Sequence, residues 1–104
     1  MADPHSHTIL HRPAQGRFEL SLEGGVAVAD YVLNGSTLIL THTFVPPELR
    51  GRGLAEQLTR AALEHARAQR LRVEPACSYV ATFLARHPEY GDLLADAAGQ
   101  GRSG

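Results

Sequence analysis

The dipeptide Asn34-Gly35, set between two strand-like segments, constrains the fold of this chain more than any other feature. Val26–Leu33 and Thr37–Phe44 read as strands, and both turn residues tolerate the positive φ angles of a tight hairpin. Arg17–Leu22 alternates between apolar and polar residues before an earlier glycine turn. These segments predict an antiparallel meander, which ends at Pro46-Pro47 because proline donates no ladder hydrogen bond.

The periodicity changes after the meander from alternation to helical spacing. From about Gly53 to Gln69, apolar residues recur at intervals of three and four, which predicts an amphipathic helix. A strand follows at Leu71–Pro75, and a helix of this length predicts a right-handed crossover that makes the strand parallel to a neighbour. Ser78 is the expected N-cap of a second helix over Tyr79–Arg86. The pattern indicates the α/β (α+β) class, with a mixed, mostly antiparallel sheet and two main helices.

Length and composition indicate one compact domain. A chain of 104 residues, 43% of them hydrophobic, can bury one core but not two. We assign residues 17–97 to this domain, residues 98–104 to a disordered tail, and residues 1–16 to a flexible arm that can add a short strand around Thr8–Leu10. The histidines of the arm have no Cys or carboxylate partners at ligand spacing, so we expect no metal site.

Charge, cysteine content and hydropathy argue against other classes of protein. The net charge of −1 argues against a nucleic-acid binder, which usually has a strong basic excess, and all ten basic residues are Arg. A single Cys excludes an internal disulfide and suits a reducing compartment. No apolar run approaches the ~18 residues of a membrane span, and the first residues lack the apolar segment of a signal peptide. We therefore expect a cytoplasmic protein without membrane or nucleic-acid partners, either a monomer or a weak homodimer.

The loop between the meander and the first helix has the clearest chemical meaning. The segment 50–55, Arg-Gly-Arg-Gly-Leu-Ala, is short, basic and glycine-bearing, and it opens a helix. The first helical N–H groups lack intrahelical acceptors, and the helix dipole adds about half a positive charge, so such a loop can bind a pyrophosphate. The alternative is a tight strand-to-helix connection with solvated arginines. The loop is neither G-x-G-x-x-G nor a P-loop, which argues against dinucleotide and nucleoside triphosphate sites.

The same segment carries a resemblance to a known family. Arg-x-x-Gly-x-Ala at 50–55 matches the Q/R-x-x-G-x-G/A signature with which GNAT-superfamily acetyltransferases hold the acetyl-CoA pyrophosphate. Thr41–Ala55, Val73–Val80 and Arg86–Tyr90 resemble the small, cysteine-containing GNAT-like N-acetyltransferase family. The resemblance covers roughly residues 17–94, and three blocks in the right order make it far more specific than the loop alone.

The resemblance implies a fold, a cofactor and an activity. The sheet would be split into a V, and acetyl-CoA or CoA would lie in the split with its thioester arm beside the end of the third strand. Backbone N–H groups of residues 51–55 would hold the pyrophosphate. The activity would be transfer of acetyl to a primary amine acceptor, either a small molecule or a protein amine. The expected cofactor-binding residues are Phe44, Val45, Arg50, Gly51, Arg52, Gly53, Leu54 and Ala55.

Two residues are candidates for catalysis. Cys77, the only thiol, lies between a strand and a helix start, where a lowered pKa would let it take an acetyl group. The resemblance marks it as catalytic; the alternatives are a small buried apolar residue, or direct amine attack without an acetyl-enzyme. His42 shares strand parity with Leu38 and Leu40, so we expect it on their apolar face, as a base or as a hydrogen-bonded core residue. Tyr79 is a weaker candidate proton donor to the leaving thiolate, and core packing is its simpler explanation.

Two other functions stay open at this point. One is a CoA- or acyl-CoA-binding module without efficient catalysis, in which Cys77 and His42 are idle. The other is an interaction domain whose Arg50 and Arg52 bind a different anion, such as RNA phosphate. Affinity that falls steeply with salt and is indifferent to CoA would identify that domain.

Overall fold

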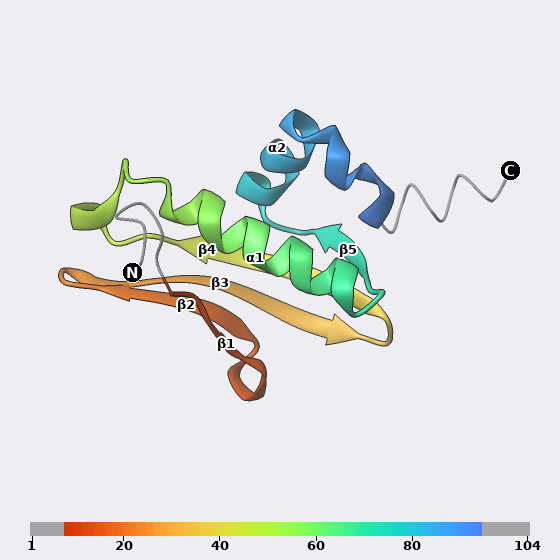
Figure 1. The fold of residues 1–104 in the computed structure, drawn as a ribbon, viewed down its shortest axis with the longest axis horizontal. Helices are drawn as coiled ribbons and strands as arrows, with labels where there is room; N and C mark the ends of the chain where they lie inside the picture. Colours follow the sequence, from red (N-terminus) through yellow and green to blue (C-terminus); the bar gives the residue numbers. More distant parts are fainter. Residues whose placement is uncertain (1–7, 95–104) are drawn as a thin grey trace, which may run out of the picture.

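A five-stranded mixed sheet forms the base of the structure, a computed structural model that describes residues 8–94 (Figure 1). The strands lie side by side in chain order, the first four antiparallel to one another and the last parallel to its neighbour. They are β1 (Leu10–Arg12), β2 (Arg17–Leu22), β3 (Gly25–Asn34), β4 (Thr37–Phe44) and β5 (Arg72–Pro75).

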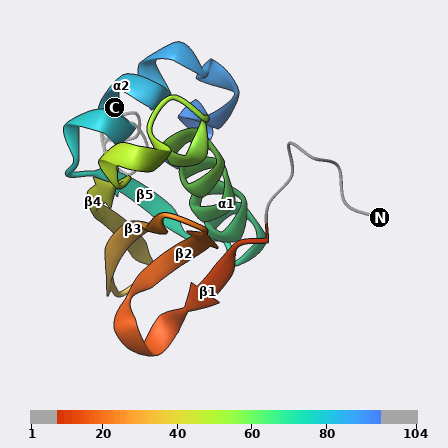
Figure 2. The same cartoon turned by 90° about the vertical axis from the view of Figure 1, so that its left-hand side faces the viewer.

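Two α-helices and three short 3-10 helices complete the described part of the chain. They are α1 (Leu54–Ala68), α2 (Ser78–Arg86), η1 (Pro13–Gln15), η2 (Pro47–Leu49) and η3 (Pro88–Leu93). The end-on view shows the sheet curving around one side of α1, with α2 and η3 above β4 and β5 (Figure 2). The connection from β4 through α1 to β5 makes the last strand parallel to its neighbour, which confirms the predicted parallel pairing, and the right-handed sense of the crossover stays a prediction.

The core lies between α1 and the sheet, as the helical periodicity predicts. The buried stripe of α1 packs on the inward-facing side chains of β2, β4 and β5, and α2 closes the core at one end. The residues at its centre are Leu20, Leu38, Leu40, Leu58, Ala62, Leu63, Ala66 and Val73, each with 1% exposure or less. Removing this much apolar surface from water is the main force that holds the two layers together.

Most predicted elements occur within one residue of the predicted bounds, and two predictions need correction. β2 and β4 have the predicted bounds, whereas the short first strand lies at Leu10–Arg12, two residues later than expected. The predicted N-cap of α2 is wrong, because the helix begins at Ser78 and Cys77 occupies the cap position with extended φ and ψ of −100° and 134°. The predicted tail at 98–104 lies outside the described residues, and the domain boundaries stay predictions.

The last strand borders only the first half of its neighbour. β5 pairs with β4 from Thr37 to Leu40 and ends at Pro75, whereas β4 continues to Phe44. The last hydrogen bond across this pair runs from Ala76 N to Leu40 O at 3.0 Å. Beyond it β5 has ended, so residues 41–44 of β4 have no partner in β5; the V-shaped split expected from the resemblance stays a prediction.

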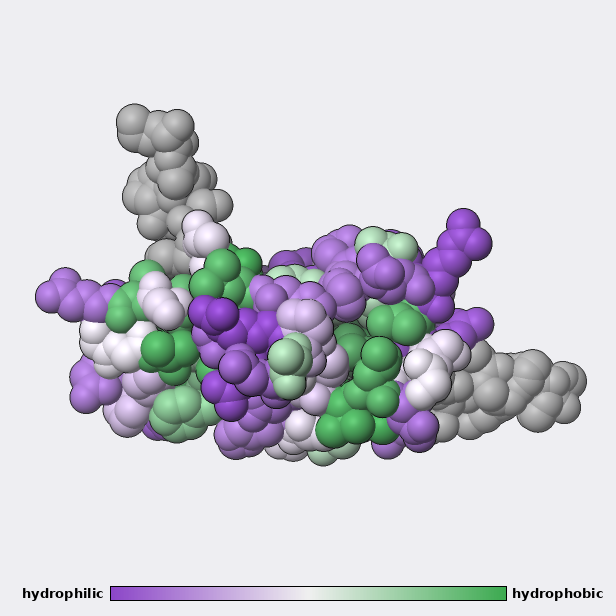
Figure 3. All heavy atoms as spheres, turned by 90° about the horizontal axis from the view of Figure 1, so that it is seen from below, coloured by the Kyte–Doolittle hydropathy of each residue, from purple (hydrophilic) through white to green (hydrophobic). Residues whose placement is uncertain are grey.

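The sheet face away from α1 is partly polar. Ion pairs link β1, β2 and β3 there: Arg12 and Arg17 contact Glu19 at 2.7 and 3.6 Å, and Arg17 contacts Asp30 at 3.3 Å. Seen from below the sheet, hydrophilic side chains occupy the middle of the molecule, and hydrophobic ones gather toward its ends (Figure 3). The sheet face opposite α1 therefore carries both polar and apolar side chains. Within residues 8–94, no helix is both long and apolar enough to span a bilayer.

Candidate functional site

The loop that leads into α1 is fixed by buried residues at its two ends. Leu49, at the end of η2, and Leu54, at the start of α1, are only 1% and 2% exposed. Between them the backbone turns at Gly51 and Gly53, whose φ angles of 83° and 75° are left-handed. A Cβ at either glycine would meet no atom within 4 Å, so the conformation, not crowding, requires glycine there. The same open space lets a ligand approach the backbone closely.

The first turn of α1 presents unpaired backbone donors to this loop. Gly53 is the N-cap, it supplies no side-chain cap, and the first intrahelical bond runs from Gln57 N to Gly53 O at 3.1 Å. The N–H groups of Leu54, Ala55 and Glu56 precede that bond and have no acceptor within the helix. Arg60 binds the Glu56 carboxylate at 3.0 Å, which reduces its negative charge beside the helix start. The arrangement suits an anion.

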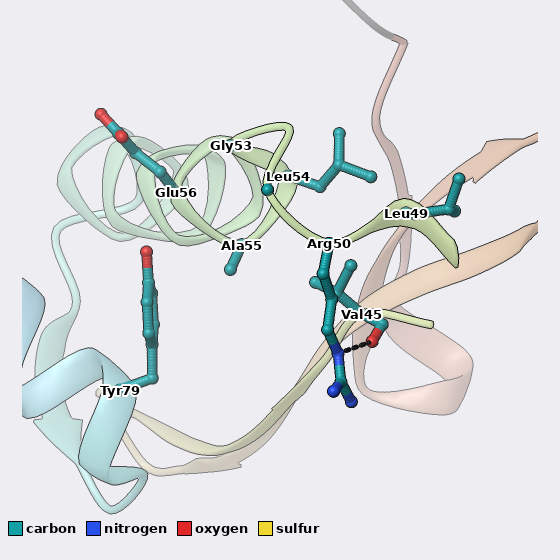
Figure 4. Close-up of a pocket in the computed structure, with 9 residues that line it drawn as sticks. Val45, Leu49, Arg50, Gly53, Leu54, Ala55, Glu56 and Tyr79 are labelled. Atoms are coloured by element: carbon teal, nitrogen blue, oxygen red, sulfur yellow. Dashed lines mark hydrogen bonds between the residues drawn. The ribbon is translucent and has the colours of Figure 1, made fainter. Parts of the chain in front are cut away.

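The two loop arginines behave differently. Arg50 Nε donates to the carbonyl oxygen of Val45 at 3.1 Å, and its side chain runs away from the start of α1 (Figure 4). Arg52 is exposed and has no hydrogen bond or ion pair to any residue in the 8–94 range. The guanidinium of Arg52 is therefore the freer positive charge beside the helix.

A pocket of about 210 Å³ lies where this loop, α1 and α2 meet. Tyr79 stands across the pocket from Ala55, and its hydroxyl points toward α1 (Figure 4). Six of the eight predicted cofactor-binding residues line the pocket, whereas Phe44 and Arg52 do not. The lining residues are Val45, Leu49, Arg50, Gly51, Gly53, Leu54, Ala55, Glu56 and Tyr79.

The environment of Tyr79 differs from the core packing expected for it. Its side chain is 39% exposed and faces the pocket. Partial burial raises the pKa of its phenol, and the nearby Glu56 carboxylate raises it further, so the hydroxyl keeps its proton at neutral pH. Tyr79 can therefore donate a proton within the pocket. The sequence carried little sign of this, because an aromatic residue in the first turn of a helix fits a core equally well.

Cys77 lies at the N-terminus of α2, next to β4. Its Sγ contacts Thr43 Oγ1 at 3.7 Å, and its backbone carbonyl accepts the Ala81 N–H at 3.0 Å. Burial is the largest single influence on the thiol and raises its pKa. The backbone N–H groups of Val80 and Tyr79, together with the Thr43 hydroxyl and N–H, favour the thiolate, and the net effect lowers the pKa. Cys77 is half-buried and polarised, unlike an inert core thiol.

The expected position of His42 is wrong. The strand register pairs Asp30 with His42 but Tyr31 with Leu40, so Thr41 is an extra residue, a β-bulge, on β4. The bulge reverses the alternation of side chains, which leaves His42 exposed opposite Asp30 and brings Thr43 opposite the buried Ala29. Within the described residues, no hydrogen bond or ion pair joins His42 to Cys77; the side chain hydrogen-bonded to the thiol is that of Thr43.

No group of three or more His, Cys, Asp or Glu side chains is suitably placed for a metal ion within residues 8–94. Of the histidines in the predicted arm, His5 and His7 lie outside the described residues. His11 is part of a ring cluster in which it stacks on Phe18 at 4.2 Å and hydrogen-bonds to Tyr31 at 2.6 Å.

Comparisons with known proteins agree on one family. Residues 17–93 match the family model of the GCN5-related N-acetyl-transferases. Protein NATD1 of Bos taurus is 34% identical over 75% of this chain and 72% of its own length, and that of Xenopus tropicalis is 31% identical over 83% of each. The solution NMR structure of a GCN5-like candidate N-acetyltransferase from Staphylococcus aureus superposes with a TM-score of 0.68, at 26% identity over 84% of this chain and 86% of the other. The chain therefore belongs to the GCN5-related N-acetyl-transferase family.

Proposed function

We propose that this protein is an acetyl-CoA-dependent N-acetyltransferase that moves acetyl to a primary amine through an acetyl-Cys77 intermediate. One observation carries the proposal: the N-terminus of α1 and Tyr79, in the first turn of α2, line a single pocket, and Cys77 lies at the cap of that same helix, two residues before Tyr79. The N-terminus of α1 would hold the pyrophosphate, Tyr79 faces the pocket, and Cys77 is outside the pocket lining, at the N-cap of α2. Membership of the family supports acyl transfer in general, and the pocket adds the residues for it.

The residues present fit a CoA pyrophosphate. The N–H groups of Leu54 and Ala55 have no intrahelical acceptor, Arg52 makes no hydrogen bond or ion pair within residues 8–94, and the left-handed glycines leave the backbone uncovered. These are the donors and the open backbone that bind phosphate oxygens elsewhere in proteins. The bound acetyl-CoA would supply the activated acetyl thioester.

In the proposed reaction, Cys77 forms and breaks the bonds to the acetyl group, Tyr79 donates a proton, and water accepts the released protons. Cys77 first loses its thiol proton to water, and its lowered pKa favours this loss. Sγ then attacks the acetyl carbonyl, forming the Sγ–C bond as the donor's C–S bond breaks, while Tyr79 gives its proton to the departing thiolate and regains one from water. A neutral amine finally attacks acetyl-Cys77: the N–C bond forms, the Sγ–C bond breaks, and the nitrogen loses a proton to water.

The orientation of His42 favours a second candidate, a CoA- or acyl-CoA-binding module without turnover. With the imidazole on the other face of the sheet, the pocket lacks the base expected from the sequence. If the protein is an acetyltransferase, the acceptor amine must therefore enter the pocket in its neutral form or lose its proton to water. We keep His42 as a candidate base only for an acceptor amine that binds on the outer face of the sheet, where its imidazole lies.

Intact-protein mass spectrometry after brief incubation with acetyl-CoA separates these functions. The chain has no Lys, so a stable acetyl mark on it cannot be lysine autoacetylation, and peptide mapping separates a Cys77 thioester from an ester or an N-terminal amide. We expect a hydroxylamine-sensitive adduct that maps to Cys77 and disappears in Cys77→Ser, with CoA affinity nearly unchanged. Bound CoA without an adduct, and without acetylation of any amine tested, would support the binding module. Lack of CoA binding would reject both.

A further inference from the structure

We propose that Thr43 is the positioning residue of the Cys77 thiol, and that it occupies the inner face of β4 on which the sequence analysis expected His42. The inference rests on the proposed function, since it concerns how Cys77 is made ready for acyl transfer. In the resting state, the Cys77 thiol donates a hydrogen bond to the hydroxyl oxygen of Thr43. Once Cys77 has ionised, the hydroxyl rotates and donates to the thiolate.

The contact joins two elements that are far apart in the sequence. Thr43 lies near the end of β4 and Cys77 caps α2, 34 residues later, yet Sγ and Oγ1 are 3.7 Å apart, a normal distance for a hydrogen bond to sulfur. Both side chains are half-buried, which strengthens a polar contact relative to one in water. Because Thr is β-branched, its hydroxyl direction is set by few rotamers, so it can orient Sγ.

The bulge at Thr41 creates this contact. In a regular strand, His42 would share the face of Leu40 and Thr43 would point to the outer side of the sheet. The extra residue reverses that order, so Thr43 faces inward opposite Ala29. A bulge re-aims side chains in this way without changing the fold.

The titratable side chains on β4, β5 and α2 point away from the Cys77 thiol, so they do not position it. On β4, His42 is on the other face, and on β5, Glu74 pairs with Ile39 on that same outer face. On α2, the Tyr79 hydroxyl points toward α1 and into the pocket (Figure 4). Thr43 and the backbone N–H groups of the first turn are the polar groups that favour the thiolate.

The test is the rate of Cys77 alkylation by iodoacetamide as a function of pH, in wild type, Thr43→Val, Thr43→Ser and His42→Gln. Valine keeps the shape of threonine and loses the hydroxyl. We expect Thr43→Val to shift the alkylation profile to higher pH and to lower reactivity at neutral pH about tenfold, the scale of one hydrogen bond to a charged group. Thr43→Ser should keep the wild-type profile, and so should His42→Gln.

An unchanged profile in Thr43→Val would overturn the proposal, and so would a shift in His42→Gln equal to that in Thr43→Val. If Thr43→Val does not fold, as judged by circular dichroism, Thr43→Ala is measured instead and the same outcomes apply. Acetylation is measured separately with acetyl-CoA. A Thr43-dependent thiol that never forms an acetyl adduct would reject the proposed function while leaving the role of Thr43 intact.

Discussion

Replacing Gly53 by Ala tests whether the start of α1 needs glycine for its backbone conformation alone. An alanine in the left-handed region costs about 1–2 kcal/mol. No steric cost is added, because a Cβ at this position would meet nothing within 4 Å. The lower entropy of the unfolded chain returns about 0.4–1 kcal/mol. We therefore expect Gly53→Ala to lower the free energy of unfolding by about 1 kcal/mol, and Tm by about 4–8 °C for a domain of this size.

Thermal unfolding followed by circular dichroism measures this change, and Gly91→Ala is the matched control. Gly91 lies in η3 without a positive φ, and a Cβ there also meets nothing within 4 Å. The control should be as stable as wild type or slightly more stable. Equal Tm values for the two variants would refute the reasoning, because they would show that the left-handed conformation of Gly53 carries no cost for alanine.

Three further predictions concern charge and protonation. Arg52→Glu should weaken CoA binding measured by calorimetry more than Arg50→Glu does, because Arg50 is already bonded to a backbone carbonyl; equal losses would contradict this. Burial, followed by the charge of His65, lowers the pKa of His11, so the folded state binds fewer protons there than the unfolded state. Stability should therefore be full above the ordinary His pKa of about 6.5 and fall as the pH drops below it, and His11→Gln should flatten this dependence of Tm on pH. Tyr79→Phe should slow acetyl transfer to Cys77 in rapid-quench experiments while leaving CoA affinity near wild type; an unchanged rate would remove Tyr79 as the proton donor.

The extent to which the sequence predicts the fold depends on how local the signal is. β2 and β4 have the predicted bounds because alternation and turn residues act over a few positions. The first strand is displaced because it consists of three residues and is defined by its pairing with β2. The cap of α2 was misplaced by one residue, since Ser78 is a better capping residue by type than Cys77.

The candidate site shows the same division. The prediction that the loop binds an anion rests on its glycines, its arginines and the helix after it, all neighbours in sequence. The contact between Cys77 and Thr43 joins residues that no local pattern relates. The face taken by His42 depends on the bulge at Thr41, which exists only in the pairing of β4 with β3.

By itself, the sequence determined the meander, the amphipathic helix, the parallel last strand and a glycine-bearing basic loop at the start of that helix. These features depend on backbone preferences and on the spacing of apolar residues along one segment. Only the tertiary structure decided which side chains meet: Thr43 beside Cys77, Tyr79 in the pocket, and His42 on the far side of the sheet. The physical reason is that the face of a strand residue is set by its register with a partner strand, so one extra residue reverses every side chain after it.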